Sequence, residues 1–375
     1  MNRNLDNARR MKSDEFYTQY CDIQKEIEVY LDYNKNVFKG KVVYCNCDDP
    51  YESNFFRYFV LNFNKLELRQ LITTSYKPSP LANTQLELYS DNKTVTPQKG
   101  RPKVTANKFI INEVYDTDGD GEFNLKDIAK KLRENKNNEW APLKENGDFR
   151  SAECVELLKQ SNIVVTNPPF SLFREYVKQL FEYNKKFVII GNMNAITYKE
   201  IFSLIKANKL WLGQSISSGD REFQVPDNYP ITASGWRIDD SGRKYIRVKG
   251  VRWFTNLDHG RRHQSLPLMT MVDNLKYSKH KEIKGKDSYN HYDNYDAIEI
   301  PFTDSIPNDY EGVMGVPISF LDKYSPQQFE ILGMSASAGY NRDIVGIPFL
   351  GVKDARPLIN GKNTYARIFI KNKKI

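Results

Sequence analysis

Several apolar runs in the chain have the length of a buried strand and alternate with segments of helical spacing. Residues 41–45 form one such run, and apolar side chains in residues 55–60 follow it at helical spacing. The runs 162–166 and 186–190 enclose a further helical segment, residues 172–183. Continuous apolar strands that alternate with helices are typical of a parallel sheet covered on both faces. The pattern therefore predicts an α/β fold with helices on both faces of the sheet.

Further elements flank this core. A helix is expected within residues 14–30, and strands are expected within residues 66–75 and 108–112. Prolines at positions 78, 80, 97 and 102 interrupt the polar stretch between these strands, which indicates a loop. The sequence thus predicts an insertion at about residues 76–146.

The C-terminal part of the chain has a different pattern. Residues 221–225 and 251–255 are expected to form the arms of a long antiparallel hairpin at one edge of the sheet. After residue 262 the periodicity is lost, and Pro and Gly become frequent. We therefore expect a sheet-containing domain of residues 1–262 and an irregular C-terminal region of residues 263–375.

The composition indicates a soluble globular protein. Of the 375 residues, 40% are hydrophobic and 27% are charged, and this balance argues against a disordered chain. No window approaches 18 consecutive apolar residues, and the N-terminus lacks the apolar run of a secretory signal. The four cysteines are too few for a disulfide framework and are expected to be reduced. These features favour a cytoplasmic protein without a membrane span.

The excess positive charge is concentrated in one stretch. Residues 237–286 hold 13 Lys and Arg against five Asp and Glu, whereas the rest of the chain holds 42 of each sign. Basic residues interleaved with aromatic ones are typical of a nucleic-acid backbone binder, although a solvated basic face has the same composition. Within this stretch, His259 and His263 are expected to be solvated rather than to bind a metal. The candidate phosphate-binding residues are Arg243, Lys244, Arg247, Lys249, Arg252, Arg261 and Arg262.

The segment Asn167-Pro168-Pro169-Phe170 carries the most specific chemistry in the chain. It directly follows the predicted strand 162–166 and precedes a helix. Two prolines offer no backbone N–H, so the loop presents the Asn167 side-chain oxygen and the Pro168 carbonyl as acceptors at the carboxyl edge of the sheet. Such acceptors suit the exocyclic amino group of a base, and the Phe170 ring can stack on that base. The alternative is a turn that only ends the strand.

A second motif lies inside the predicted insertion. Asp116, Asp118, Asp120 and Asp127 occupy positions 1, 3, 5 and 12 of a calcium-loop pattern, and Glu122 occupies position 7. The pattern departs from the usual one because Asp replaces the bidentate Glu at position 12, and no second loop is present in the sequence to pair with it. A structural calcium ion and a solvated turn that caps the following helix are both open interpretations.

Seven segments of the chain resemble the EcoRI-type family of adenine-specific DNA methyltransferases. The segment 162–177, which contains Asn167-Pro168-Pro169-Phe170, is similar to the family's catalytic region. The other six similar segments are residues 14–18, 47–50, 147–151, 191–194, 253–259 and 312–317. This resemblance covers most of the chain and implies a Rossmann-like methyltransferase sheet, S-adenosylmethionine (AdoMet) as methyl donor and duplex DNA as substrate.

The resemblance also implies roles for regions and residues. Residues 1–262 would form the AdoMet-binding catalytic domain, and residues 263–375 would form the DNA target-recognition region. Asn167, Pro168, Pro169 and Phe170 would hold a flipped adenine. The implied cofactor-binding residues are Tyr17, Thr18, Asp48, Asp49, Pro50, Ser53, Thr73, Asp148, Phe149 and Asn167.

The loop after the first strand departs from the pattern of related amino-methyltransferases. Those enzymes have Asp-Pro-x-x-Gly-x-Gly at this place, whereas residues 49–54 contain no Gly. Helix capping is the alternative role of Asp48 and Asp49, and an ordinary helix start is the alternative for Tyr17 and Thr18.

The implied activity has several alternatives. A cytosine amino-methyltransferase or an RNA methyltransferase would use a similar acceptor loop, and a non-catalytic DNA-binding protein could retain the same sheet. A cognate restriction endonuclease as genetic partner is also left open by the sequence.

Overall fold

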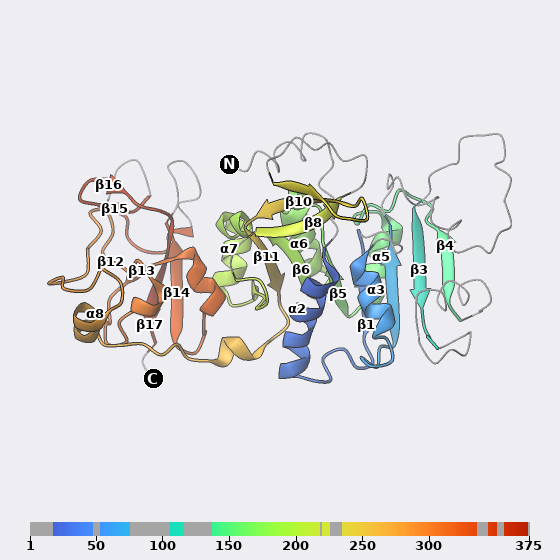
Figure 1. The fold of residues 1–375 in the computed structure, drawn as a ribbon, viewed down its shortest axis with the longest axis horizontal. Coiled ribbons are helices and arrows are strands. Elements are labelled where there is room, and N and C mark those ends of the chain that lie inside the picture. Colours follow the sequence, from blue (N-terminus) through green and yellow to red (C-terminus); the bar gives the residue numbers. More distant parts are fainter. Residues whose placement is uncertain are drawn as a thin grey trace. The chain divides into compact units, whose positions relative to one another are not determined.

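The computed structural model describes residues 18–47, 53–75, 106–115, 137–217, 220–225, 235–335, 344–350 and 356–373 (Figure 1). The chain divides into two compact units. Unit 1 comprises residues 1–193 and 218–257, and unit 2 comprises residues 194–217 and 258–375. The second segment of unit 2 begins close to the boundary that the sequence predicts at residue 262, while its first segment lies within the predicted N-terminal domain.

Unit 1 is built around a mixed sheet. Its strands follow the order β4-β3-β2-β1-β5-β6-β11. The four central strands β2, β1, β5 and β6 are parallel, whereas β3, β4 and β11 run antiparallel to their neighbours. The strands are β1 (Val42–Cys45), β2 (Gln70–Thr74), β3 (Asn107–Ile111), β4 (Glu139–Pro142), β5 (Ile163–Thr166), β6 (Lys186–Asn192) and β11 (Val251–Thr255). The parallel core confirms the predicted α/β fold.

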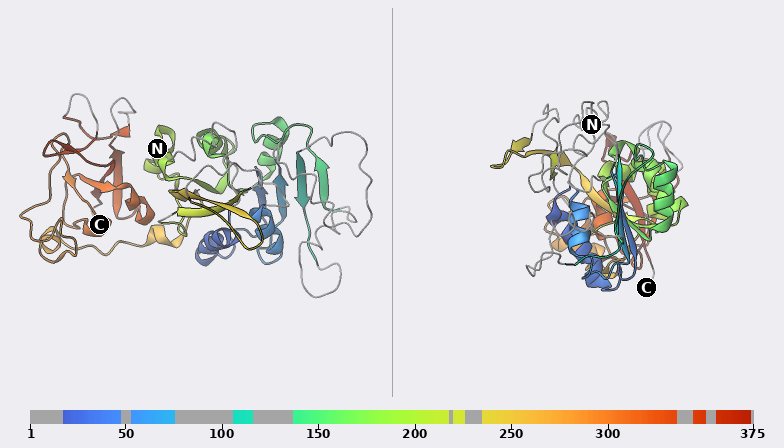
Figure 2. Two further views of the ribbon diagram at one scale, coloured as in Figure 1. Left: turned by 45° about the horizontal axis from the view of Figure 1, so that its top comes forward. Right: turned by 90° about the vertical axis from the view of Figure 1, so that its right-hand side faces the viewer.

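Helices cover both faces of this sheet. Helices α2 (Tyr20–Tyr33) and α3 (Asn54–Leu61) lie on one face, and α5 (Ala152–Gln160) and α6 (Phe173–Glu182) lie on the other (Figure 2). The strands β1 and β5 are buried at every position, as expected for strands covered on both sides. Ser53 begins α3 as its N-cap, because its side chain accepts hydrogen bonds from two backbone N–H groups of the first turn.

The predicted long hairpin was wrong in its pairing. Strand β8 (Asp220–Val225) pairs with β10 (Lys244–Lys249), and β10 pairs with β9 (Trp236–Ile238), so these strands form a separate antiparallel sheet. The expected second arm, β11, instead pairs with β6 in the main sheet. The physical reason is burial: all five residues of β11 are buried, and only a position in the central sheet covers both faces of such a strand.

Unit 2 contains sheet structure that the sequence did not predict. Its four-stranded sheet has the order β12-β13-β17-β14, and β15 and β16 form a small hairpin. Most of these strands are short, and β17 pairs with strands far from it in sequence, which explains why periodicity did not reveal them. The strands are β12 (Ile298–Glu299), β13 (Met314–Pro317), β14 (Phe329–Met334), β15 (Leu358–Ile359), β16 (Lys362–Asn363) and β17 (Arg367–Asn372).

The remaining elements are short. Unit 2 also contains helices α7 (Lys199–Lys206) and α8 (Met271–Tyr277) and strand β7 (Trp211–Leu212). The 3₁₀ segments are η1 (Phe170–Leu172), η2 (Met193–Thr197), η3 (Gly260–His263), η4 (Thr303–Ser305) and η5 (Ile318–Lys323). No helix in the described part of the chain is both long and apolar enough to cross a membrane.

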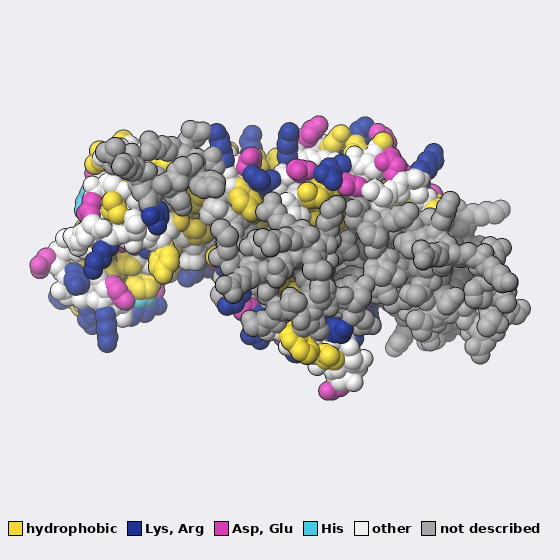
Figure 3. All heavy atoms as spheres, turned by 90° about the horizontal axis from the view of Figure 1, so that it is seen from above, with side chains coloured by type: hydrophobic (Ala, Val, Ile, Leu, Met, Phe, Trp, Pro, Cys, Tyr) yellow, Lys and Arg dark blue, Asp and Glu magenta, His cyan; other side chains and the backbone are white. Residues whose placement is uncertain are grey.

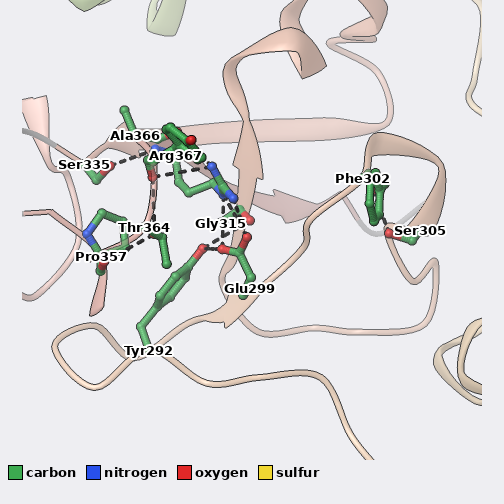
Figure 4. A network of polar contacts seen from close by, with 11 residues as sticks. Tyr292, Glu299, Phe302, Ser305, Gly315, Ser335, Pro357, Thr364, Ala366 and Arg367 are labelled. Carbon is green, nitrogen blue, oxygen red and sulfur yellow. Dashed lines mark hydrogen bonds and ion pairs between the residues drawn. The ribbon is translucent and has the colours of Figure 1, made fainter. Parts of the chain in front are cut away.

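A buried ionic network holds the sheet of unit 2 together (Figure 4). The Arg367 guanidinium on β17 donates to the Glu299 carboxylate on β12, with Nη2–Oε1 at 2.5 Å and Nε–Oε1 at 3.0 Å. The Tyr292 hydroxyl donates to the same carboxylate. The side chains of Arg367 and Glu299 are only 11% and 7% exposed, so their charges depend on each other for compensation.

Candidate active site

The carboxyl ends of β1, β2 and β5 meet at one edge of the sheet, because these strands are parallel neighbours. Cys45 at the end of β1 pairs with Thr73 of β2, and β5 lies on the other side of β1. Open α/β sheets bind their ligands outside this edge. The segments that follow these three strands therefore form the candidate active site.

The loop after β1 leaves the sheet through Asn46 and Cys47. Asn46 is buried, and Cys47 has a φ of 64°, in the left-handed region that residues other than Gly seldom adopt. The chain returns at Ser53, the buried N-cap of α3. Close to this point, the Asn54 side-chain amide donates to the Thr18 carbonyl at 2.7 Å. Thr18 and Ser53, predicted as cofactor residues from distant segments, therefore lie near each other.

Two hydroxyls at this edge suit a polar ligand. The side-chain oxygens of Thr18 and Thr73 are buried, and neither has a hydrogen-bond partner among the residues that the structure describes. Leaving a buried hydroxyl without a partner costs about 1–3 kcal/mol. A ligand that carries an amino-acid end and ribose hydroxyls, as AdoMet does, can supply the missing partners.

Gly147 brings a further predicted cofactor segment to the end of β2. Its φ is +78°, and a Cβ placed on it would lie 2.0 Å from the backbone oxygen of Ser75, the residue that follows β2. Only Gly combines the left-handed conformation with this close approach. The contact places Asp148 and Phe149 beside the strand end that carries Thr73.

We expect the Gly147→Ala substitution to destabilise unit 1 by about 2 kcal/mol or more and to weaken AdoMet binding, because it adds strain and displaces the segment. Gly40→Ala is the matched control, since Gly40 has a φ of +65° but nothing within 4 Å of the added Cβ. The control should show only the strain and bind AdoMet like the parent. Thermal unfolding and titration calorimetry measure both effects, and equal AdoMet affinity of the two variants would contradict the role of Gly147.

The Asp148 carboxylate is held in its ionised form. The Arg150 guanidinium donates to both oxygens at 2.9 and 2.7 Å, and these hydrogen bonds lower the pKa of the Asp148 carboxyl below its ordinary value. An ionised carboxylate is an acceptor for an amino group, as the predicted contact with the cofactor's adenine requires. Phe149 is buried and packs edge-on against the ring of Tyr176, with centroids 5.0 Å apart.

Asn167-Pro168-Pro169-Phe170 directly follows β5 at the same edge. Asn167 and Pro168 are buried, whereas Pro169 and Phe170 are partly exposed. The Leu172 backbone N–H donates to the Pro169 carbonyl at 2.9 Å, which closes the 3₁₀ turn before α6. Asn167 and Pro168 are thus buried at this edge, and Phe170 lies nearer to the surface.

Several predicted site residues lie outside the described residues, and their roles stay predictions. They are Tyr17, Asp48, Asp49 and Pro50 of the cofactor set and Asp116, Asp118, Asp120, Glu122 and Asp127 of the calcium loop. Within the described ranges, no cluster of three or more His, Cys, Asp or Glu side chains could hold a metal ion.

The small sheet β8-β10-β9 is connected to the edge of the main sheet that carries the candidate site. Val251, the first residue of β11, pairs with Asn192 at the carboxyl end of β6, the strand beside β5. The Asn192 side-chain amide donates to the Lys249 carbonyl at 2.9 Å, and the Met193 backbone N–H donates to the Gly250 carbonyl at 2.6 Å. The turn between β10 and β11 is therefore fixed to the carboxyl edge of the main sheet.

Four of the predicted phosphate-binding residues belong to this small sheet or its turn. Arg247 and Lys249 are exposed, Lys244 is partly exposed, and the exposed Arg243 forms an ion pair with Asp239 at 2.8 Å. On the face drawn in Figure 3, both basic and acidic side chains are present among the residues shown in colour. Fewer basic side chains are therefore available for phosphates than the sequence count suggests, because Arg243 is already paired with Asp239.

Two of the predicted phosphate-binding residues are buried, and this corrects their assignment. Arg252 is 4% exposed, and its guanidinium donates to the Val251 carbonyl at 2.9 Å. Arg262 is 6% exposed and donates to Asp258 at 2.7 Å and to Asn208 at 2.6 Å. Its guanidinium also lies 3.5 Å from the centroid of the Trp211 ring. Arg252 and Arg262 support the fold, whereas the neighbouring Arg261 is partly exposed.

His259 is not solvated, contrary to the sequence prediction. It is 3% exposed, and its Nε2 lies 3.1 Å from the Leu212 carbonyl. Burial lowers the pKa of its imidazole to about 4, so the ring is neutral at physiological pH. A neutral, buried ring within unit 2 cannot contribute to the charge of a phosphate-binding surface.

Sequence reasoning missed two features of the site and its surroundings. The buried side chains of Asn46 and Tyr176 meet at the site edge, although they are 130 positions apart. Trp236 and Ile238 on β9 are each 49% exposed. The first feature gave no sequence signal, because no local pattern reveals a contact across 130 residues. The second gave only a weak one, the aromatic Trp236 next to the basic Arg237.

A parallel α/β core with an Asn-Pro-Pro-Phe loop at its carboxyl edge defines the class: an AdoMet-dependent methyltransferase fold. The sequence model of the family described as "Adenine-specific methyltransferase EcoRI" matches residues 4–373. The chain belongs to this family, and membership of a methyltransferase family implies the use of AdoMet.

Curated relatives agree with the family match over the whole length. The chain is 42% identical over 374 residues to Type II methyltransferase M.EcoRI of Escherichia coli, covering 100% of this chain and 98% of the relative. It is 33% identical over 372 residues to Type II methyltransferase M.MpnI of Mycoplasma pneumoniae, covering 98% and 97%. It is also 33% identical over 375 residues to Type II methyltransferase M.MgeORF184P of Mycoplasma genitalium, covering 98% of each chain. No solved structure gave a significant match.

Proposed function

We propose that this protein transfers the methyl group of AdoMet to the exocyclic amino group of an adenine flipped out of duplex DNA. The observation that carries the proposal is the position of Asn167 and Pro168, which are buried directly after β5 beside the carboxyl end of β1. Family membership and the names of the relatives support the same chemistry.

The target amino group binds to the acceptors of this loop. It donates one hydrogen bond to the Asn167 side-chain oxygen and one to the Pro168 carbonyl, which turns its lone pair away from both. The partly exposed Phe170 ring stacks on the flipped base. The chain thus aligns the nitrogen for attack, and alignment is the main source of rate in this site.

The cofactor lies against the segments that follow β1 and β2. Thr18 and Ser53 bind its amino-acid end, Thr73 binds the ribose, and Asp148 and Phe149 hold its adenine. When bound, AdoMet supplies a methyl group on a positively charged sulfur. The target nitrogen needs no earlier deprotonation, because its proton becomes acidic only once the methyl group has been gained. That proton would then pass to solvent, and the cofactor would leave as the neutral thioether. Asn167 and Pro168 keep their hydrogen bonds to the nitrogen as positive charge develops on it, so they stabilise the transition state.

DNA binds to basic residues of the small sheet β8-β10-β9, which is connected to the site edge, and to Arg261. Arg243, Lys244, Arg247 and Lys249 provide phosphate contacts on unit 1, and Arg261 provides one on unit 2. Unit 2 reads the target sequence, as proposed for residues 263–375. The comparisons give no support for a calcium ion.

We expect the double substitution Arg247→Ala, Lys249→Ala to lower the slope of log affinity against log salt by about 0.9 for each charge removed. The loss should be the same for different DNA sequences, because phosphate contacts carry no sequence information. The control is Lys35→Ala, Lys65→Ala, which removes the same charge from exposed positions elsewhere in unit 1. Fluorescence anisotropy at several salt concentrations measures the slope, and equal slopes for the two variants would remove β10 from the DNA surface.

The activity itself is tested by supplying AdoMet with duplex DNA, single-stranded DNA or RNA and identifying the methylated base by mass spectrometry. The proposal requires N6-methyladenine in duplex DNA. Methylated cytosine, or methylation of RNA alone, would replace the proposed substrate. Absence of AdoMet binding by calorimetry would instead indicate a DNA-binding protein without catalysis.

A further inference from the structure

Helix α6 follows the substrate loop and also contacts other segments of the candidate site. It begins at Phe173, directly after η1, whose first residue is Phe170, so the substrate loop lies at its N-terminal end. Three residues of its first two turns, Glu175, Tyr176 and Gln179, contact segments that follow other parts of the sheet. All of these segments belong to the proposed cofactor site.

The Tyr176 hydroxyl reaches the loop after β1. It donates to the side-chain oxygen of Asn46, and both residues are buried, with exposed fractions of 0% and 2%. The Thr166 hydroxyl at the end of β5 donates to the Asn46 carbonyl. Asn46 is therefore held from α6 and from β5 just before the chain enters the left-handed turn at Cys47.

The same helix holds the segment of Asp148 and Phe149. The Tyr176 ring packs against the Phe149 ring with an interplanar angle of 73°. The Gln179 side-chain amide donates to the Phe149 carbonyl at 3.1 Å. Glu175 binds Arg150 at 3.0 Å, and Arg150 in turn binds Asp148. Three side chains of α6 thus hold the segment of residues 148–150. Gln179 binds its backbone, Tyr176 packs against its aromatic ring, and Glu175 pairs with its arginine.

We infer that Tyr176 is a positioning residue for the cofactor. Its hydroxyl fixes Asn46 directly after β1, its ring fixes Phe149, and the helix that carries it follows the substrate loop. The placement of the methyl donor and that of the target base are therefore set by one rigid element. This inference rests on the proposed function, because it assigns AdoMet to the edge formed by these loops.

The Tyr176→Phe substitution separates the two contacts. It keeps the ring against Phe149 and removes only the hydrogen bond to Asn46, so we expect the dissociation constant and the KM of AdoMet to rise about tenfold. The kcat at saturating AdoMet should stay within about twofold of the parent value, since the acceptors of the target nitrogen are untouched. Amide hydrogen exchange of Asn46 and Cys47 should become faster in the AdoMet-free protein.

Tyr30→Phe is the matched control. Tyr30 is equally buried, and its hydroxyl donates to Glu26 at 2.6 Å within α2. Its loss should lower the unfolding temperature without changing AdoMet affinity or the exchange of Asn46. A second variant, Asn46→Ala, removes the same hydrogen bond from the other side. The double variant Asn46→Ala, Tyr176→Phe should bind AdoMet no more weakly than Asn46→Ala alone, because both changes break one contact.

Two outcomes would overturn the inference while leaving the proposed function intact. One is a Tyr176→Phe variant that binds AdoMet like the active parent. The other is a double variant in which the two losses of affinity multiply, since the residues would then act independently. A parent protein that neither binds AdoMet nor methylates DNA would overturn the proposed function, and with it the assignment of Tyr176 to a cofactor site.

Discussion

Replacing Asn167 with Ala is expected to lower kcat by about two orders of magnitude or more, while the affinity for AdoMet changes only a few-fold. In the proposed reaction Asn167 accepts a hydrogen bond from the target nitrogen, and this bond strengthens as the nitrogen gains positive charge. The interaction is therefore worth more in the transition state than in the ground state, so its loss appears in kcat rather than in binding.

The control for this prediction lies at the opposite end of the same strand. Asn162 precedes β5, and its side-chain oxygen accepts from the Val42 backbone N–H of β1 at 2.8 Å. Asn162→Ala should lower stability by about 1 kcal/mol and leave kcat near the parent value. Single-turnover methylation of duplex DNA with saturating AdoMet measures the chemical step. Transfer by Asn167→Ala at the parent rate would refute the assignment of the acceptor loop.

Breaking the buried network of unit 2 is expected to produce the largest loss of stability. The Arg367→Met substitution leaves the Glu299 carboxylate buried without its guanidinium, and removal of one member of such a pair typically costs about 3–5 kcal/mol. The Tyr292 hydroxyl still donates to the carboxylate but does not neutralise it. Urea unfolding followed through Trp211, which belongs to unit 2, measures the loss.

An exposed ion pair of the same unit provides the comparison. Lys279 binds Asp304 at 2.7 Å, and their side chains are 75% and 42% exposed. Lys279→Met should cost less than about 1 kcal/mol, because water compensates the remaining charge. The double variant Glu299→Gln, Arg367→Met should recover part of the stability lost by Arg367→Met, since no buried charge is left alone. A loss for Arg367→Met as small as that of the control would show that this network does not stabilise unit 2.

The apolar pattern predicted the central part of the fold closely. The runs 41–45 and 162–166 correspond to β1 and β5, and the helix expected at 172–183 corresponds to α6. Residues 55–60, expected to be helical from their spacing, belong to α3, which Ser53 caps. These elements depend on burial at successive positions and on local capping, which are properties of a short stretch of sequence.

Pairing and burial of the later segments could not be predicted in the same way. The unexpected strand β10 separates β8 from β11, and β17 lies between β13 and β14, which precede it by more than 30 residues. Arg252 and Arg262 count as surface charges in a composition, yet both are buried beside specific acceptors. The pairing of each strand and the burial of each arginine depend on which distant segment packs beside it.

The candidate site shows the same division. The sequence by itself determined the chemistry of the acceptor loop, because two prolines after Asn167 remove backbone donors wherever the loop lies. Only the tertiary structure decided that Gly147 contacts Ser75 and that Tyr176 contacts Asn46. The physical reason is that residue type sets which bonds a side chain can form, whereas the packing of sheet and helices sets which partner it meets.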